Sequence, residues 1–240
     1  MRIELKLELI EGLEIPTEYH SMVLAFFKNS VEKYNSELKD ILYEERKMKE
    51  ITFSTFFSLD KFDGEIIKLK NSGIRILFSC YDELLGLHFF NSFLLALYKE
   101  FTYKKYKIVL NRVTRIKEKN VEKDEAVFKI LSPVVIREKI SEEKSNYHMI
   151  DDEKGVEILK LNMINSLKKF PEKYIQQLEI EPIQVKKVIV RLYKAKFQCS
   201  LGIVKVKGKK EILNYLYKAG LSTSRRGLGF NMVDIIDEEV

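Results

Sequence analysis

The sequence contains little of what marks membrane, disulfide-stabilised or zinc-binding proteins. No unbroken apolar run reaches the ~18 residues that a membrane-spanning helix needs, which excludes a helical membrane span. The two cysteines, Cys80 and Cys199, lie in separate apolar segments, as expected for small core residues in a reducing compartment rather than for a disulfide pair. The three histidines are scattered, and no His/Cys cluster has zinc-ligand spacing. We therefore expect a cytoplasmic protein without a resident metal or cofactor.

What the chain does contain is an uneven distribution of charge. Its 42 basic and 36 acidic residues leave a net charge of +6, yet residues 185–229 hold twelve basic residues and a single acid, Glu211. This basic segment alone carries +11 (12 minus 1), so the rest of the chain is net acidic. The twelve are Lys186, Lys187, Arg191, Lys194, Lys196, Lys205, Lys207, Lys209, Lys210, Lys218, Arg225 and Arg226. Such density is typical of a polyanion-binding surface, most often for RNA or DNA, and the alternative is a solvated lysine-rich face.

Five aromatic residues are interleaved with the basic segment. They are Tyr193, Phe197, Tyr215, Tyr217 and Phe230. Rings beside cations offer stacking surfaces for nucleobases, whereas rings at strand spacing are more often part of a core. The sequence leaves both interpretations open.

A glycine-bounded loop with two adjacent arginines precedes the last apolar stretch of the chain. Gly220, Gly227 and Gly229 permit positive φ and close backbone approach, so they suit a loop wrapped around a ligand. Backbone N–H groups and the guanidinium groups of Arg225 and Arg226 would suit phosphate. The loop lacks the Gly-Lys-Ser/Thr of a nucleotide P-loop and the dinucleotide fingerprint. A surface turn with solvated arginines is the alternative.

The hydrophobic pattern predicts the same order of elements twice. In the first half it predicts strands at residues 2–9, 51–59, 74–80 and 106–116, helices at 18–42 and 82–101, and turns at 63–64 and 71–73. Residues 117–125 are a charged linker. In the second half it predicts strands at 127–136, 187–193, 197–207 and 229–236, and helices at 153–170 and 209–219. The order β-α-β-β-α-β predicts an α+β protein of two tandem ferredoxin-like domains, residues 1–120 and 121–240.

Four motifs together resemble a known family. They are the glycine loop, residues 131–135 (Leu-Ser-Pro-Val-Val), Ile15-Pro16 before the first helix, and residues 51–54 (Ile-Thr-Phe-Ser). In these the chain resembles the CRISPR repeat-RNA processing endoribonucleases of the RAMP superfamily, the sixth Cas family. The resemblance covers essentially the whole chain. It departs at Ser222, where the family's loop often has a second glycine, and at Asn231, where it often has another.

The resemblance implies metal-independent cleavage of the repeat in a CRISPR transcript. The ribose 2′-OH would attack the adjacent phosphate and leave a 2′,3′-cyclic phosphate and a 5′-OH. In the family a histidine, a tyrosine and a lysine share the acid, base and cation roles, and these positions fall here on Tyr43, Lys28 and Lys49. Lys49 would stabilise charge. A phenol with a pKa near ~10 is a poor base, although a cation such as Lys28 or Arg46 beside Tyr43 would lower that pKa.

His20 is a further catalytic candidate. It begins the first helix, about 12 Å along the helix axis from Lys28, so it would reach the phosphate if the RNA followed that helix. A helix-cap or surface histidine is the alternative.

The residues expected to contact RNA come from the basic segment and the glycine loop. They are Lys186, Lys187, Arg191, Lys194, Lys196, Lys205, Lys207, Gly220, Ser222, Ser224, Arg225, Arg226, Gly227 and Gly229. The expected partner is CRISPR repeat RNA, bound by a monomer or homodimer without membrane contact. The alternative is an inactive relative that holds repeat RNA, or a RAMP subunit of the interference complex. An unrelated ferredoxin-like RNA-binding protein is disfavoured by the tandem order and the specific loop.

Overall fold

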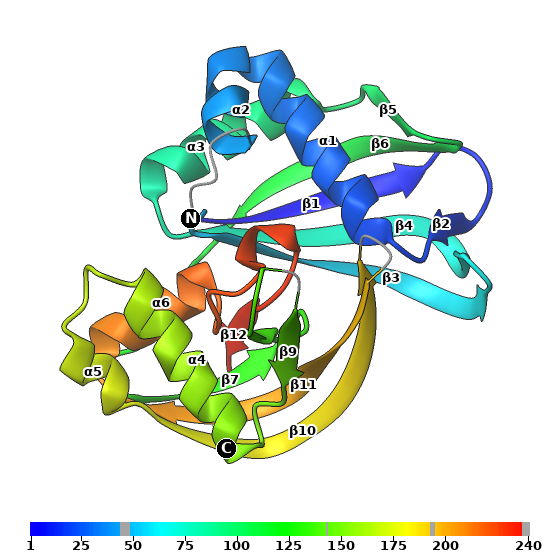
Figure 1. The fold of residues 1–240 in the computed structure, drawn as a ribbon. Coiled ribbons are helices and arrows are strands. Elements are labelled where there is room, and N and C mark those ends of the chain that lie inside the picture. Colours follow the sequence, from blue (N-terminus) through cyan, green and yellow to red (C-terminus); the bar gives the residue numbers. More distant parts are fainter. Residues whose placement is uncertain (44–48, 143, 193–194, 237–240) are drawn as a thin grey trace.

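The protein folds into two α+β halves with its C-terminal loop between them (Figure 1). The structure is a computed structural model that describes residues 1–43, 49–142, 144–192 and 195–236. The N-terminal half contains β1 (Arg2–Leu9), β2 (Glu14–Pro16), α1 (Tyr19–Tyr34), α2 (Ser36–Tyr43), β3 (Ile51–Asp63), β4 (Ile66–Cys80), α3 (Glu83–Leu95), β5 (Glu100–Tyr103) and β6 (Tyr106–Ile116). The C-terminal half contains β7 (Glu125–Ile130), β8 (Ile136–Lys139), β9 (Ser145–His148), α4 (Glu153–Ser166), α5 (Glu172–Gln176), β10 (Glu179–Leu192), β11 (Ala195–Lys207), α6 (Lys210–Ala219), the 3-10 turn η1 (Arg226–Leu228) and β12 (Val233–Ile235).

Both halves have the strand order of a ferredoxin-like sheet. The main antiparallel strands run β3-β4-β1-β6 in the N-terminal sheet and β10-β11-β7-β12 in the C-terminal sheet. Counted within each half, both read second, third, first and fourth strand, as the β-α-β-β-α-β order requires. The α+β tandem prediction is therefore confirmed. Residues 117–124, every one of them described, form no helix or strand between the two sheets.

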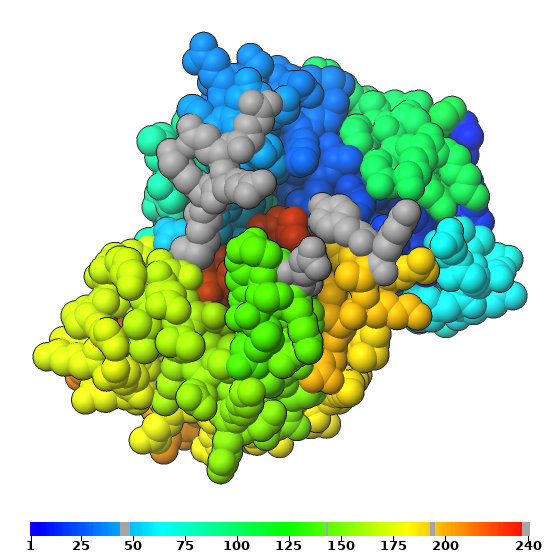
Figure 2. All heavy atoms as spheres, viewed as in Figure 1, coloured from blue at the N-terminus to red at the C-terminus, as the bar shows by residue number. Residues whose placement is uncertain are grey.

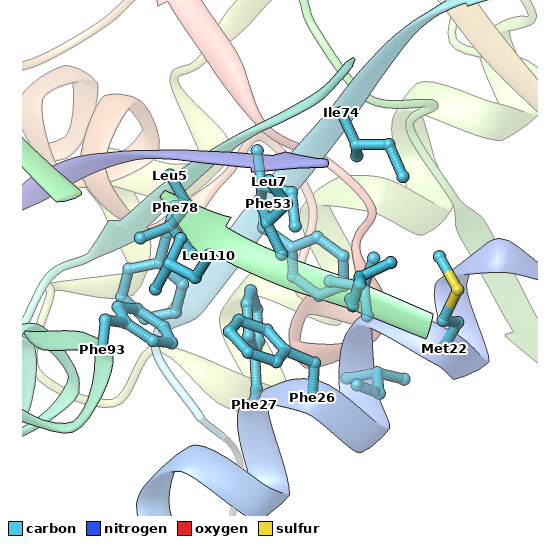
Figure 3. Close-up of a cluster of buried hydrophobic side chains, with 14 of the residues drawn as sticks. Leu5, Leu7, Met22, Phe26, Phe27, Phe53, Ile74, Phe78, Phe93 and Leu110 are labelled. Carbon is cyan, nitrogen blue, oxygen red and sulfur yellow. The ribbon is translucent and has the colours of Figure 1, made fainter. Parts of the chain in front are cut away.

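The N-terminal core lies between the apolar face of the sheet and the apolar face of α1. Along β1, Leu5 and Leu7 are buried while Lys6 between them is exposed, because successive side chains point to opposite faces of the sheet. Phe26 and Phe27 of α1 are also buried, and they meet these strand residues in one cluster with Phe53, Phe78 and Phe93 (Figure 3). This packing fixes α1 on the sheet, so it also fixes the position of Lys28, the next residue along the helix.

The predicted helix 18–42 is two helices, α1 and α2. Asn35 separates them with an extended backbone (φ −160°, ψ 108°), and its side chain accepts a hydrogen bond of 2.9 Å from Leu38 N–H. An asparagine side chain in this position caps the start of the second helix. Lys28 and Tyr43 therefore lie on different helices.

Other predicted boundaries fail for local reasons. The expected turn at 71–73 lies inside β4, which runs unbroken from Ile66 to Cys80, whereas the turn at 63–64 is confirmed between β3 and β4. Helix 82–101 ends at Leu95 and is followed by β5. The strand predicted at 127–136 divides into β7 and β8 around Pro133, which has no N–H for a sheet ladder. The closing strand shortens to β12 because residues 229–232 belong to the loop.

Side chains of the N-terminal sheet donate hydrogen bonds to backbone carbonyl groups of the C-terminal half. Ser79 Oγ donates a hydrogen bond of 2.6 Å to Lys218 O. Arg2, 4% exposed, donates to Tyr217 O at 2.7 Å and to Val233 O, and its guanidinium lies 3.7 Å from the centre of the Tyr217 ring. Buried carbonyls need such donors, so the two halves form a fixed contact. Within the described residues no helix is long and apolar enough to cross a membrane.

Candidate functional site

Three sequence motifs that are far apart along the chain meet at the contact between the halves. Thr52 Oγ1 of β3 donates to Phe230 O at 2.6 Å, and Ser54 Oγ donates to Leu131 O at 2.6 Å. Asn231 N–H donates to Pro133 O at 3.1 Å. The glycine loop is thereby tied to residues 51–54 and to residues 131–135. Figure 2 shows it as red atoms between the blue N-terminal and green C-terminal surfaces.

The loop takes its shape from positive φ angles at four positions. Gly220 has φ +97° and Gly229 φ +86°, and the non-glycine residues Arg225 (φ 53°) and Asn231 (φ 71°) are also left-handed. Gly227, expected from sequence to need this freedom, does not have a positive φ. Its conformation is open to other residues, so its position is distinguished by its neighbour, Lys49, rather than by its backbone.

Arg226 is part of the interior, not of the surface that the sequence predicted. Its side chain is 2% exposed, and it donates to Ser222 O at 3.3 Å and to the Tyr215 hydroxyl at 2.7 Å. That hydroxyl donates to Glu50 Oε1 at 2.9 Å, which Lys169 Nζ also approaches at 2.6 Å. The guanidinium thus begins a polar chain that crosses between the halves. Ser222 is likewise buried, and its hydroxyl donates to Val135 O at 2.7 Å.

Arg225 is half-buried and lies on the other side of the loop. Its guanidinium donates to the Tyr147 hydroxyl at 2.7 Å and lies 4.9 Å from the centre of the Phe197 ring. The two adjacent arginines, which the sequence treats alike, therefore point into different environments.

Lys28, Tyr43 and Lys49, the positions that the resemblance implied, lie together beside the loop. Lys49 Nζ is 3.8 Å from the centre of the Tyr43 ring and Lys28 Nζ is 5.1 Å from it, both within cation–π range. A Cβ built on Gly227 would lie 3.7 Å from Lys49 Cδ, so the loop backbone is in contact with this cluster. The structure brings two ammonium groups, a phenol and the backbone of the glycine loop to one place.

The environment changes the proton affinities of this cluster. Burial, with a smaller contribution from the charge of Lys28, lowers the pKa of Lys49 to about 8. Burial raises the pKa of Tyr43, which is the opposite of the lowering expected from neighbouring cations. Arg46, the other cation considered, lies outside the described residues. At neutral pH Tyr43 is therefore protonated, and a minor fraction of Lys49 is neutral.

His20 is neither a helix cap nor a surface residue. It is 3% exposed, its ring stacks on Tyr19 at 4.3 Å and on Phe230 of the loop at 4.9 Å between ring centres, and Glu18 holds the cap position. Burial lowers the pKa of His20 to about 4, an effect only partly offset by a hydrogen bond with the Gly229 backbone. His20 is therefore neutral at pH 7, and its ring packs against Phe230 of the loop.

The basic segment does not form one uninterrupted cationic face. Among the described residues, five of its members make ion pairs with acids from outside the segment: Arg191 with Glu18 and Glu65, Lys205 with Glu125, Lys207 with Glu179, Lys209 with Asp124, and Lys218 with Glu83 and Glu118. Lys186, Lys187 and Lys196 are exposed and make no ion pair with any described residue. Lys194 and Tyr193 lie outside the described residues. Tyr215, Tyr217 and Phe230 are core residues, each at most 1% exposed.

Sequence reasoning missed Glu50, Lys169 and Tyr147. Lys169 and Tyr147 meet the site only through the fold, and no local pattern marked them; Glu50 is adjacent to Lys49, which was the one available signal. In the described part of the chain no three His, Cys, Asp or Glu side chains are grouped so that they could hold a metal ion.

The C-terminal half of the chain matches a known protein family. Residues 116–235 match the protein family described as CRISPR associated protein Cas6, C-terminal. No curated protein sequence matches the chain.

Solved structures show the same fold over the whole length. The product of a Cas6-related gene from Pyrococcus furiosus is 22% identical, with a TM-score of 0.83 over 100% of this chain and 99% of that one. A RAMP protein described as binding different RNA substrates is 23% identical, with a TM-score of 0.82 over 99% of this chain and 100% of that one. A Cas6 product complex is 16% identical, with a TM-score of 0.73 over 98% and 100%. At these identities the likeness is one of fold.

Proposed function

The chain belongs to the Cas6 family of CRISPR-associated proteins, and on that premise we propose that it binds CRISPR repeat RNA and cleaves it beside Lys49. The observation that carries the proposal is the cluster of Lys28, Tyr43 and Lys49 in contact with Gly227 of the loop. A polyanion held by the loop would place a phosphate next to two ammonium groups.

The reaction we propose is metal-independent transesterification. The ribose 2′-oxygen loses its proton to a base and bonds to the adjacent phosphorus. The bond to the 5′-oxygen breaks, and that oxygen takes a proton from an acid. The products are a 2′,3′-cyclic phosphate and a 5′-OH. The negative charge on the phosphoryl oxygens must be stabilised in the transition state.

Lys49 is the residue best suited to transfer the proton. With a pKa of about 8 it has a substantial neutral fraction near physiological pH, so it can take a proton from the 2′-OH. Lys28, the neighbouring cation that contributes to that low pKa, would stabilise the phosphoryl charge.

Tyr43 and His20 would have other roles. The Tyr43 ring lies under both ammonium groups, and its hydroxyl, kept protonated by burial, is a donor and not a base. His20 would act as a positioning residue through its stacking on Phe230.

Two groups of residues would contribute to RNA binding: those that contact the RNA and those that fix the shape of the loop. Lys186, Lys187 and Lys196 present exposed charge, and Arg225 lies on the loop. Arg226 and Ser222 would keep the loop in its binding shape through their buried hydrogen bonds. We also retain Arg191, Lys194, Lys205, Lys207, Gly220, Ser224, Gly227 and Gly229 as candidate RNA contacts.

The test is incubation of the full chain with its cognate repeat RNA in EDTA, followed by mapping of the product ends. A single cut that leaves a 2′,3′-cyclic phosphate is expected, and Lys49→Met should abolish it while RNA binding persists. Tight binding without any cut by the unmodified protein would contradict the enzymatic proposal. It would favour the alternative, a relative that only holds repeat RNA or serves the interference complex, and the tyrosine at the position implied for histidine agrees with that alternative.

A further inference from the structure

A column of aromatic rings runs from the N-terminal half through the glycine loop to the surface of the C-terminal half. His20 stacks on Phe230 at 4.9 Å with the ring planes 8° apart. Phe230 contacts Phe197 at 5.7 Å with the ring planes tilted by 55°, and Phe197 stacks on Tyr147 at 4.8 Å with an interplanar angle of 19°. Phe197 and Phe230 are buried, whereas Tyr147 is only half-buried. The column therefore ends at the surface on a tyrosine ring.

A shallow pocket lies at this end of the column, between β9 and the hairpin of β10 and β11. Tyr147, Phe197 and the exposed Ile189 supply its apolar surface, and Lys196, Gln198 and His148 supply polar groups. Within the described residues no carboxylate lines the pocket. Glu138 lies outside it, with its Oε2 2.8 Å from His148 Nε2. An apolar platform with a cation and an amide, and without an acid, suits a planar group attached to a phosphate.

The Tyr147 ring is held firmly by its neighbours. Its hydroxyl accepts a hydrogen bond of 2.7 Å from Arg225, and its carbonyl accepts one of 2.5 Å from Gln198 Nε2. Arg225 is two residues from Gly227, which contacts Lys49. The pocket and the proposed cleavage site are thus joined by one short stretch of the loop.

We propose that the pocket, called here the Tyr147 pocket, binds one unpaired nucleobase of the RNA, stacked on Tyr147, with a neighbouring phosphate on Lys196. This inference rests on the proposed RNA-binding function and extends it by a base-binding subsite. The base adds one member to an existing column of rings, so little ordering of side chains is needed on binding. Stacking is tolerant of base identity, and the Gln198 carboxamide oxygen is an acceptor suited to an exocyclic amino group.

The test uses short single-stranded oligoadenylate that carries one 2-aminopurine, whose fluorescence is quenched by stacking. Binding to the full chain is followed by anisotropy of an end label and by quenching of 2-aminopurine in the same samples. Tyr147→Leu should remove the quenching and weaken binding roughly 5- to 150-fold, the range for one stacked base. Tyr147→Phe, which keeps the ring, should retain most of the quenching. Tyr103→Leu is the matched control: it removes a half-buried tyrosine with a lysine Nζ 5.5 Å from its ring, but in the N-terminal half.

The outcomes separate this inference from the proposed function. No anisotropy change with the unmodified protein would refute a base-tolerant subsite, while binding of the cognate repeat RNA in the cleavage assay tests the proposed function separately. Binding with equal quenching in the unmodified and Tyr147→Leu proteins would refute the subsite alone. Equal quenching of the free 2-aminopurine nucleotide would assign the pocket to small nucleotides and also overturn the inference.

A second measurement does not depend on folding of the variant. Irradiation of the unmodified protein with an oligouridylate containing 5-iodouridine should cross-link the base to Tyr147 or Phe197, as located by mass spectrometry of the peptides. Cross-links confined to other regions would refute the Tyr147 pocket.

Discussion

Replacing Gly229 with alanine should destabilise the protein far more than the same change at Gly227. Gly229 has φ +86°, and a Cβ built there would lie 2.5 Å from Phe53 Cε2 and 2.8 Å from His20 Cδ2. Both rings are buried, so neither can swing into solvent. At Gly227 the φ is not positive and the nearest atom, Lys49 Cδ, is 3.7 Å away, an ordinary contact distance.

The expected magnitude follows from two costs at Gly229. A left-handed backbone costs a non-glycine residue about 1–2 kcal/mol. Forcing a methyl group into a packed interior costs about 1–3 kcal/mol more. The sum, about 2–5 kcal/mol, corresponds to a fall in Tm of roughly 4–20 °C for a chain of this size. Gly227→Ala should change stability by less than about 1 kcal/mol, because the new side chain meets neither cost.

The assay is thermal unfolding of the two variants and the unmodified protein in the same buffer. Binding of repeat RNA is then measured below the lower Tm. We expect Gly229→Ala to lose affinity as well, since the substitution displaces the ring column beneath the loop. Equal Tm values for the two variants would refute the packing argument, and a destabilised Gly229→Ala protein with unchanged affinity would separate the loop's shape from RNA binding.

Three further predictions concern charge. If Lys49 is the base, the cleavage rate should rise with pH through about 8. Lys28→Met should move that inflection to higher pH, because the charge of Lys28 helps to lower the pKa of Lys49. A flat pH–rate profile would exclude Lys49 from proton transfer. Arg225→Ala should reduce the slope of log K for RNA binding against log salt concentration by about 0.7, the value for one phosphate contact to a single strand. Arg226→Ala should instead lower Tm and leave that slope unchanged, because Arg226 is buried. The reverse pattern would contradict the burial of Arg226. The pKa of His20 is about 4 in the folded protein and 6.5 in the unfolded chain, so the unfolded state takes up the proton first as pH falls. Between pH 6.5 and 4 this should lower the free energy of unfolding by about 3 kcal/mol. A His20→Gln variant with the same pH dependence would refute the buried neutral state of His20.

The sequence predicted the architecture because the information is local. Alternation in residues 2–9 and periodicity in the helices each depend on neighbours a few residues away, and their order then selects the ferredoxin-like arrangement. It failed at two other points. The break at Asn35 depends on a side-chain cap that hydrophobic periodicity does not register. Residues 71–73 resemble a turn but lie within β4, where the pairing with β3 shifts register and Gly73 pairs with Glu8 of β1.

The site was only partly predictable for the same reason. Lys28, Tyr43 and Lys49 were predicted from motif positions, and the fold places them together, while their catalytic role stays a prediction. Counting charges along residues 185–229 overstated the basic surface, because acids such as Glu65 and Glu125 come from other elements to neutralise it. A count along the chain contains no information on ion pairs between distant segments.

The sequence by itself determined the two ferredoxin-like halves, the glycine loop and the family to which the chain belongs, since these depend on residue type and order. The tertiary structure alone decided the environment of each functional group. Arg225 and Arg226 are adjacent and chemically identical, yet one contacts a half-exposed tyrosine and the other is sealed beside Tyr215. Burial and neighbouring charge arise from segments that meet only on folding, and these set the pKa values of Lys49 and His20.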